Sequence, residues 1–180
     1  MKKIIILIVL IFTIAFLLKN DKKEYLPNSE NLTVNNVFVN QQIEEENEKR
    51  TNLYKYSIKL IISNVSEYLD DKEYIAIQSK EFVDLNEVQI QEIFTYISDL
   101  YNIAIIDGNY DDLIELGIED GNGEQKGIFI QIPHIEMQVD SAEIHIGATY
   151  ASLGAEGYKI NVIFREGKWL LLNMELLWEA

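Results

Sequence analysis

Hydrophobic and polar positions divide this chain into an apolar start, a polar stretch and a patterned remainder. An uncharged apolar run of 15 residues extends from Ile4 to Leu18, between Lys3 and Lys19. A transmembrane helix needs about 20 apolar residues, roughly 17 at the least, and lysine stems extend the apolar reach at both ends. Because basic starts of this kind are typical of membrane-targeting segments, we expect residues 1–19 to be an uncleaved membrane anchor. Its apolar residues include Ile4, Leu7, Leu10, Phe12, Phe16 and Leu18.

A cleaved signal segment is the alternative for the same residues. Thr13 and Ala15 are small and two apart, as a signal peptidase requires, although cleavage there would cut inside the apolar run. A buried core helix is a third interpretation, which the flanking lysines disfavour. Long domains cross membranes largely regardless of charge, so we expect a single-pass cell-membrane protein with its C-terminal domain outside, or alternatively a secreted protein.

The next segment, residues 20–42, is rich in asparagine, contains Pro27 and has no sustained hydrophobic period. This composition predicts a polar tether. Residues 43–180 are then expected to form a single domain outside the membrane.

Two segments of this domain have the spacing of an amphipathic helix. After a charged entry at 43–50, apolar residues recur on one helical face. They are Tyr54, Ile58, Ile61, Ile62, Val65, Tyr68 and Leu69. Asp84 followed by Glu87 resembles a capping box and predicts a second helix that ends near residue 101. Short apolar runs at 73–78 and 103–107 predict strands.

From residue 126 onward the hydrophobic period becomes two, which predicts strands. The apolar positions are Ile128, Ile130 and Ile132, and then Ile135, Met137 and Val139. Their parity changes around Pro133, which cannot donate a hydrogen bond to a neighbouring strand. We therefore predict a bulge or strand break there, on an edge or rim of the sheet.

Three further strands are expected in the closing part of the chain. Ala142, Ile144, Ile146 and Ala148 share one face of the first, and Tyr158, Ile160, Val162 and Phe164 share one face of the second. Glu166 and Gly167 suit a two-residue hairpin turn. In the last strand, Leu170, Leu172, Met174 and Leu176 alternate with Trp169 and Leu171, which predicts that both faces are partly covered.

The order of these elements predicts an α+β fold, with N-terminal helices packed on a curved antiparallel sheet of about four to six strands. Two helices, a short strand and four closing strands resemble the cone-shaped nuclear transport factor 2-like and cystatin-like domains. This resemblance lies in the order of elements and implies the fold.

The last 30 or so residues resemble the end of small uncharacterised exported bacterial proteins. The matching residues are "SLGAEGY" at 152–158, "EGKW" at 166–169 and Trp178. Glu179 and Ala180 stand where that pattern has a small polar residue. The resemblance implies export and a shared fold, without an activity or site residues.

Composition narrows the function classes. The absence of cysteine excludes disulfides, thiolate metal sites and cysteine nucleophiles. After residue 20 the chain carries 12 basic and 30 acidic residues, a net charge of −18. Nucleic acid and anionic lipid are disfavoured as partners of the domain, whereas a basic protein or peptide is compatible with it.

Candidate chemistry is limited to a few residues, and we expect no cofactor. His145 and Glu143 are two apart on a strand and would form an acid–base pair if their face lined a cone-shaped cavity. His134, beside the predicted bulge, is expected to be structural. The segments 107–112 and 119–124 resemble calcium loops but lack glycine and glutamate at the sixth and twelfth positions. Their candidate ligands are Asp107, Asn109, Asp111, Asp120, Asn122 and Glu124.

Trp169, Trp178, Pro133 and Gly167 are expected to be structural, with the tryptophans closing a core. Trp178 alternatively covers the end of the sheet or contacts a partner. The sequence favours a membrane-anchored, non-catalytic binding module. A small-molecule binder or enzyme whose cavity is lined by Glu143 and His145 is the alternative.

Overall fold

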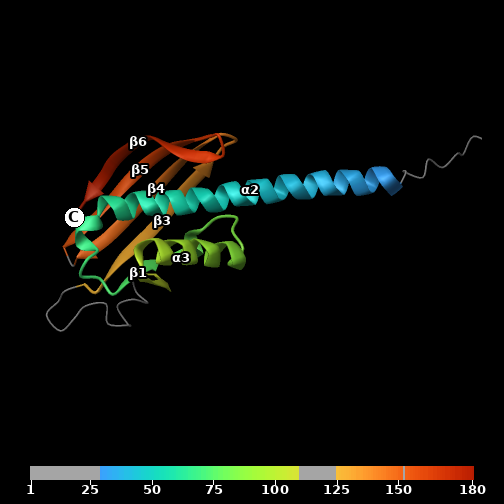
Figure 1. Ribbon diagram of the computed structural model, residues 1–180. Coiled ribbons are helices and arrows are strands. Elements are labelled where there is room, and N and C mark those ends of the chain that lie inside the picture. Colours follow the sequence, from blue (N-terminus) through green and yellow to red (C-terminus); the bar gives the residue numbers. More distant parts are fainter. Residues whose placement is uncertain (1–28, 110–124, 152) are drawn as a thin grey trace, which may run out of the picture. The chain divides into compact units, whose positions relative to one another are not determined.

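The computed structural model describes residues 29–109, 125–151 and 153–180 (Figure 1). They form an α+β fold in which two α-helices pack against a six-stranded mixed sheet. The helices are α2 (Ser29–Asn64) and α3 (Glu87–Tyr101), with short 3-10 turns η1 (Ser66–Tyr68) and η2 (Ser79–Glu81). The strands are β1 (Tyr74–Ile77), β2 (Ala104–Asp107), β3 (Gly127–Met137), β4 (Ser141–Ala151), β5 (Gly154–Arg165) and β6 (Lys168–Glu179).

The sheet has the strand order β2-β1-β3-β4-β5-β6. Strands β3 to β6 form the predicted antiparallel meander. The prediction of a wholly antiparallel sheet is wrong, because β1 pairs in parallel with both β2 and β3. The helix α3 connects β1 to β2, and a crossover of this kind returns the chain to start a parallel strand.

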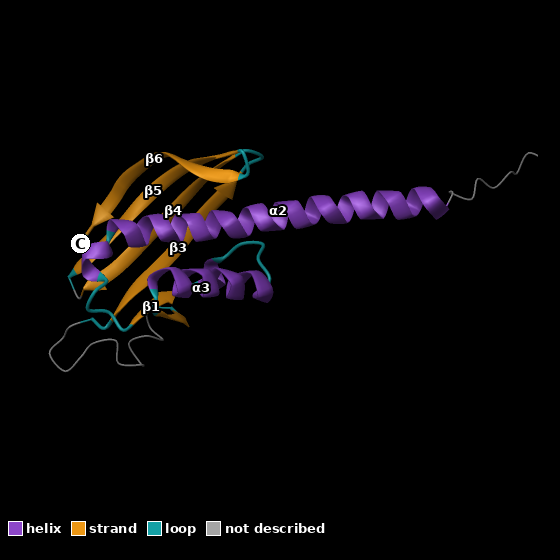
Figure 2. Ribbon diagram, viewed as in Figure 1, coloured by secondary structure: helices purple, strands orange, loops and turns teal. Residues whose placement is uncertain are grey.

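Both helices cover the same face of the sheet, as Figure 2 shows for α3 and for α2 from residue 44 onward. The core between them is largely isoleucine: Ile58 of α2, Ile93 of α3 and Ile144 of β4 are each fully buried. The predicted apolar faces of both helices and of β3, β4 and β5 are thereby confirmed at their centres. The opposite face of the sheet, here called the outer face, carries the alternating residues of the same strands.

Helix α2 begins at Ser29, well before the predicted charged entry at 43–50. The predicted tether, residues 20–42, is therefore helical from Ser29 onward. No proline, which would break a helix, occurs between Pro27 and Pro133. Adding a residue to an existing helix costs little free energy compared with starting a new helix. The helix can therefore include residues 29–42, although these residues have no sustained hydrophobic period.

The start of α3 is capped by Asn86 rather than by the predicted Asp84. The Asn86 side chain accepts a hydrogen bond from the backbone N–H of Gln89, and the Gln89 side chain accepts one from the backbone N–H of Asn86. Asp84 has a positive φ of 58° and pairs with Arg50 of α2 at 3.0 Å. The capping box was therefore predicted two residues too early, whereas the helix end at Tyr101 is confirmed.

The predicted bulge beside Pro133 is confirmed. The β3–β4 register shifts between Gln131 and His134, and buried Ile132 is followed by partly buried Ile135 on the core side. β1 pairs only with Gly127–Ile130 of β3, so Pro133 lies beyond the end of β1. Pro133 has no N–H to donate, but β1 does not extend far enough to offer it an acceptor, so no hydrogen bond between β1 and β3 is lost there.

The predicted hairpin at Glu166 and Gly167 is also confirmed. Both residues have positive φ, 52° and 76°, as a tight type I′ turn requires. In β6, however, register shifts add Leu172 and Leu177 as extra residues, so the predicted simple alternation is wrong. Trp169 is the one buried side chain of β6, and Met174 is half-buried on the same, core face.

The chain divides into two compact units, residues 1–43 and residues 44–180. The second contains the whole sheet. The predicted anchor, residues 1–19, lies outside the described residues. Within the described ranges, no helix is both long and apolar enough to cross a membrane.

Candidate functional site

Glu143 and His145, the predicted acid–base pair, lie on the outer face of the sheet. Their neighbours Ala142, Ile144 and Ile146 are buried beneath the helices, so the alternation of β4 turns the pair away from the core. His145 Nε2 lies 3.2 Å from Glu143 Oε1, and the two side chains are 35% and 40% exposed. The structure therefore does not place them in a cavity between helices and sheet.

A hollow of about 210 Å³ lies beside Glu143. Its lining includes Glu136, Gln138 and Asn161, but not His145. His145 instead faces the ring of His134, 4.9 Å away across the β3–β4 pair. The hollow thus brings together two carboxylates and amides, without the histidine of the predicted pair.

Asp107 and Asn109 are the calcium-loop candidates that the structure describes; Asp111, Asp120, Asn122 and Glu124 lie outside the described residues. Asp107 accepts hydrogen bonds from the backbone N–H of Ser79 at 3.1 Å and from its hydroxyl at 2.6 Å. The carboxylate therefore holds the turn η2 against the end of β2. No cluster of three or more metal-binding side chains occurs in the part of the chain that the structure describes.

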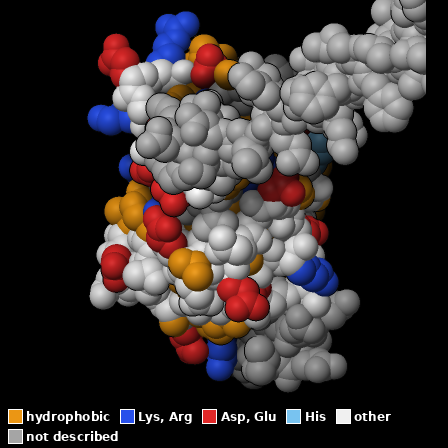
Figure 3. Space-filling view, turned by 90° about the vertical axis from the view of Figure 1, so that its right-hand side faces the viewer, with side chains coloured by type: hydrophobic (Ala, Val, Ile, Leu, Met, Phe, Trp, Pro, Cys, Tyr) orange, Lys and Arg blue, Asp and Glu red, His pale blue; other side chains and the backbone are white. Residues whose placement is uncertain are grey.

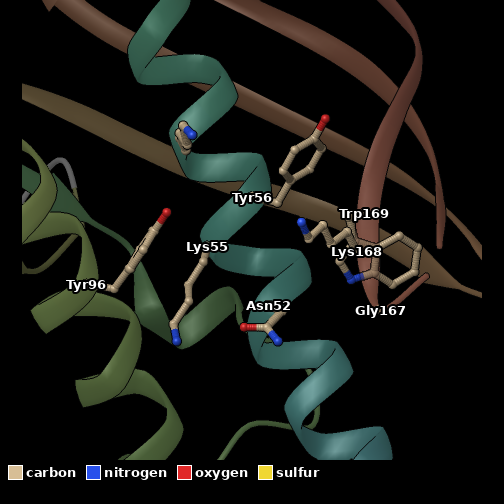
Figure 4. A pocket seen from close by; sticks show the side chains of 8 residues that line it. Asn52, Lys55, Tyr56, Tyr96, Gly167, Lys168 and Trp169 are labelled. Carbon is tan, nitrogen blue, oxygen red and sulfur yellow. The ribbon is translucent and has the colours of Figure 1, made fainter. Parts of the chain in front are cut away.

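A larger groove, about 390 Å³ in volume, lies over α2. Figure 4 shows Lys55 and Tyr96 on one side of the helix, and Tyr56, Lys168 and Trp169 on the other. The full lining is Asn52, Lys55, Tyr56 and Lys59 of α2, Tyr96 of α3, and Gly167, Lys168 and Trp169 of the last hairpin. Three elements that are distant in sequence thus supply one surface.

The groove is basic and aromatic on an otherwise acidic protein. Residues 44–180 contain ten lysines and arginines, and three of these ten line this one groove. None of the described residues that line it is acidic. Lys55 pairs with Glu92 at 2.6 Å and lies 5.4 Å from the centre of the Tyr96 ring. Lys59 and Lys168 make no ion pair within the described part of the chain, so their charges are available to a ligand.

The wall of the groove toward the last hairpin is firmly held. The Trp169 indole N–H donates to the backbone oxygen of Lys49 at 3.0 Å, and the Phe164 ring lies 5.1 Å from the Trp169 ring. Tyr56 Oη accepts a hydrogen bond from the backbone N–H of Leu171 at 2.9 Å. These contacts keep the aromatic wall in place before any ligand arrives, which reduces the entropy lost on binding.

Sequence reasoning missed this groove, although it left a signal. Asn52, Lys55, Tyr56 and Lys59 have the spacing of one helical face, but only the opposite, apolar face of the helix was used in the prediction. The contribution of Tyr96 and Lys168 has no sequence signal, because only folding brings α3 and the last hairpin beside α2.

Trp178 lies against the outer face of the sheet rather than in the core, and is 41% exposed. Its ring covers Gly157 of β5 and reaches Gly147 of β4, which pair with each other. A Cβ added at Gly157 would lie 2.2 Å from the indole ring. The glycines therefore make room for the tryptophan. Trp169, in contrast, is 4% exposed and belongs to the core, as predicted.

This close approach predicts the effect of Gly157→Ala. We expect the substitution to lower the free energy of unfolding by about 1–3 kcal/mol, because the added methyl group displaces the indole ring. In a Trp178→Ala background the same substitution should cost much less. Urea unfolding of the four proteins measures the difference, and equal costs in both backgrounds would contradict the proposed contact.

Charged side chains of both signs are interspersed on the face shown in Figure 3, where the acidic groups do not gather into one patch. No family model, curated protein or solved structure matches the chain.

Proposed function

We propose that this chain is a non-catalytic binding module, held at the outer side of a membrane by its N-terminal segment, and that the groove over α2 binds an anionic group. The observation that carries the proposal is the gathering of Lys55, Lys59 and Lys168 in a groove without acidic lining residues. On a chain with a net charge of −15, repulsion would keep anions away from most of the surface. The three lysines of the groove oppose that repulsion locally.

The aromatic walls narrow the ligand class. Tyr56, Tyr96 and Trp169 offer apolar surface next to the ammonium groups. Aromatic side chains contribute large contact areas at low entropic cost, and few polar groups are needed to orient a ligand among them. We therefore expect an anion attached to an apolar or planar group, such as an aryl phosphate or an aromatic carboxylate, to bind better than the bare anion.

The test is a titration of the full-length chain in detergent with phenyl phosphate and, separately, with inorganic phosphate. The Trp169 fluorescence reports binding in a Trp178→Phe background. Lys59→Gln with Lys168→Gln should weaken phenyl phosphate binding by up to about fivefold per lysine, since an exposed charge pair contributes up to about 1 kcal/mol. Lys55 is left unchanged because its removal would also leave Glu92 without its partner.

Lys80→Gln is the matched control, because it removes the same charge and does not line the groove. Phenyl phosphate affinity should be unaffected by this control. If the double variant and the control bind equally well, or if phenyl phosphate binds no better than phosphate, the proposed groove function is wrong. Binding should also weaken as salt concentration rises.

A basic protein or peptide is a second candidate partner, which the net charge of −18 after residue 20 favours. It would be recognised outside the groove, so its binding should be insensitive to Lys59→Gln with Lys168→Gln. The Glu143–His145 pair lies on the outer face, and His145 does not line the hollow beside Glu143, so the pair does not support the enzyme alternative.

A further inference from the structure

The last strand of the sheet, β6, has an unusually apolar edge that pairs with no other strand of the described residues. Tyr56 of α2 reaches this edge at Leu171. β6 stands at the end of the strand order and is twelve residues long. Six of its large apolar side chains are between 41% and 64% exposed. They are Leu170, Leu171, Leu172, Leu176, Leu177 and Trp178. Edge strands of stable monomers usually carry charges, prolines or bulges that discourage pairing with another chain. β6 has two bulges and three charged residues, yet half of its side chains are large, apolar and exposed.

These six residues are placed symmetrically about Met174. Leu170 and Trp178 are equally far from it along the chain, as are Leu171 and Leu177. Leu172 and Leu176 form the third such pair. An antiparallel pair of identical strands, related by a two-fold axis, places residues opposite each other in this way.

We propose that β6 pairs with β6 of a second copy of this chain, antiparallel, with the two-fold axis at Met174. Met174 then lies opposite Met174 of the second copy, and Leu170 lies opposite the second copy's Trp178. Leu171 and Leu172 lie opposite the second copy's Leu177 and Leu176. The two six-stranded sheets become one continuous sheet, and all six exposed apolar side chains of each copy gain apolar neighbours.

The faces of the sheet agree with this register. Leu170 pairs with Ile163, and Trp178 with Gly157, so both point to the outer face. Asn173 and Glu175 also lie on the outer face, because they pair with Asn161 and Lys159. Opposite residues of an antiparallel pair share a face, and the pairs Leu170–Trp178 and Asn173–Glu175 satisfy this condition.

The two bulges of β6 make the register specific. Leu172 and Leu177 are the extra residues, so each bulge sets two consecutive leucines side by side. When Met174 of one copy lies opposite Met174 of the other, Leu171 and Leu172 of each copy lie opposite Leu177 and Leu176 of the other copy. A shift by one residue would set Asn173 against Met174, which point to opposite faces.

The polar residues of the edge are also compatible with self-pairing. The Asn173 amide can donate to the second copy's Glu175, whose carboxylate already lies 3.3 Å from its own Lys159. Lys168 begins β6 and Glu179 ends it, so antiparallel pairing brings opposite charges to each end of the interface. The backbone N–H of Leu171 is occupied by Tyr56 Oη, so Leu171 contributes its side chain rather than that N–H. These features favour a second copy over an unrelated strand.

The absence of cysteine from the chain allows a direct test. In Met174→Cys the two thiols would face each other across the axis, with Cα atoms about 4.5–5.5 Å apart, within disulfide range. We expect the full-length variant, mildly oxidised in detergent, to form a disulfide-linked dimer at least about tenfold faster than free collision allows. Leu153→Cys, at a site that is 92% exposed, measures free collision.

Asn173→Cys tests the register. It lies opposite residue 175 of the second copy, so the two cysteines are separated by about 8 Å or more, given a rise of about 3.4 Å per residue. It should cross-link more slowly than Met174→Cys, provided that both variants keep the circular dichroism spectrum of the parent. Cross-linking of Met174→Cys no faster than Leu153→Cys overturns the proposal, as does faster cross-linking of Asn173→Cys.

A second measurement shows whether β6 or the N-terminal segment causes the chains to associate. Light scattering of the unmodified chain in detergent should give the mass of a dimer, and Leu172→Lys should give a monomer, because its ammonium group would face apolar side chains. Leu172 is 64% exposed, so the substitution leaves the core intact. A monomeric parent or a dimeric Leu172→Lys variant would each overturn the proposal.

Discussion

Replacing Trp169 with alanine is expected to lower the free energy of unfolding by about 3–5 kcal/mol, the usual cost of removing a large buried aromatic side chain. Trp169 is 4% exposed and its indole N–H bonds to the backbone oxygen of Lys49. This loss would be a large fraction of the free energy of unfolding of a typical domain, which is about 5–15 kcal/mol. Chemical unfolding of the full-length chain in detergent, followed by circular dichroism, measures it.

The size of this effect follows from how many elements meet at the indole. Lys49 of α2 places its ammonium group 4.2 Å from the centre of the Phe164 ring and 5.5 Å from that of Trp169. The same ammonium group pairs with Asp140 in the β3–β4 turn and contacts the backbone oxygen of Val139. Removing the indole therefore leaves a cavity where α2, the β3–β4 turn and the last hairpin join.

Trp178→Ala is the matched control, because it removes the same side chain from the same strand at a site that is 41% exposed. It should cost clearly less than Trp169→Ala. Trp169→Phe should recover part of the loss, since the ring volume returns but the indole donor does not. Equal effects of the two alanine substitutions would contradict the placement of Trp169 in the core.

Tyr54→Ala is expected to have the second large effect, again about 3–5 kcal/mol. Tyr54 is fully buried, its ring centre lies 4.4 Å from that of Phe82, and its hydroxyl accepts a hydrogen bond from the backbone N–H of Val83 at 2.8 Å. It thereby holds the segment before α3 against α2. Tyr54→Phe should cost about 1–3 kcal/mol, because it leaves the Val83 N–H without its acceptor.

Tyr56→Phe is the control for that hydrogen bond. Its hydroxyl also accepts from a backbone N–H, that of Leu171, but at the exposed edge of the sheet, where water can replace it. Its cost should therefore be small when measured by chemical unfolding. A Tyr54→Phe variant as stable as Tyr56→Phe would show that the Val83 N–H finds another partner.

Burial also raises the pKa of Tyr54 above its ordinary value of 10.0, against a smaller lowering by the Val83 N–H. A group whose pKa is raised on folding supports stability fully below its unfolded pKa, and that support is lost as the pH rises further. Stability should therefore fall above about pH 10, and Tyr54→Phe should make the fall shallower.

Local patterns predicted the elements whose signal lies within a few residues. The period-two runs identified β3, β4 and β5 with their buried faces, because side chains alternate across any strand. The parity change at Pro133 located the bulge, and Glu166-Gly167 located the final turn through its positive φ values. The start of α3 was misplaced because Asp84 and Asn86 are equally plausible caps, and the choice depends on Arg50, which lies on another helix.

The candidate site was harder to predict from the sequence than the fold was. Glu143 and His145 were correctly expected to share a face. The sequence of β4 alone does not show which of the two sheet faces the helices cover. The basic groove was missed because its charges come from α2 and from the last hairpin. The apolar edge was missed because the leucines of β6 have the composition of a buried strand.

By itself, the sequence determined the α+β class, the four closing strands and the core faces of the two helices and of β3, β4 and β5, since each follows from hydrophobic periodicity along a short stretch of chain. Tertiary structure alone decided that β1 and β2 join in parallel, that β6 stands at the open end of the sheet, and that three lysines gather over α2. Strand order and contacts between side chains of distant segments depend on how the whole chain packs. The hydrophobic periodicity of a short segment carries no information about that packing.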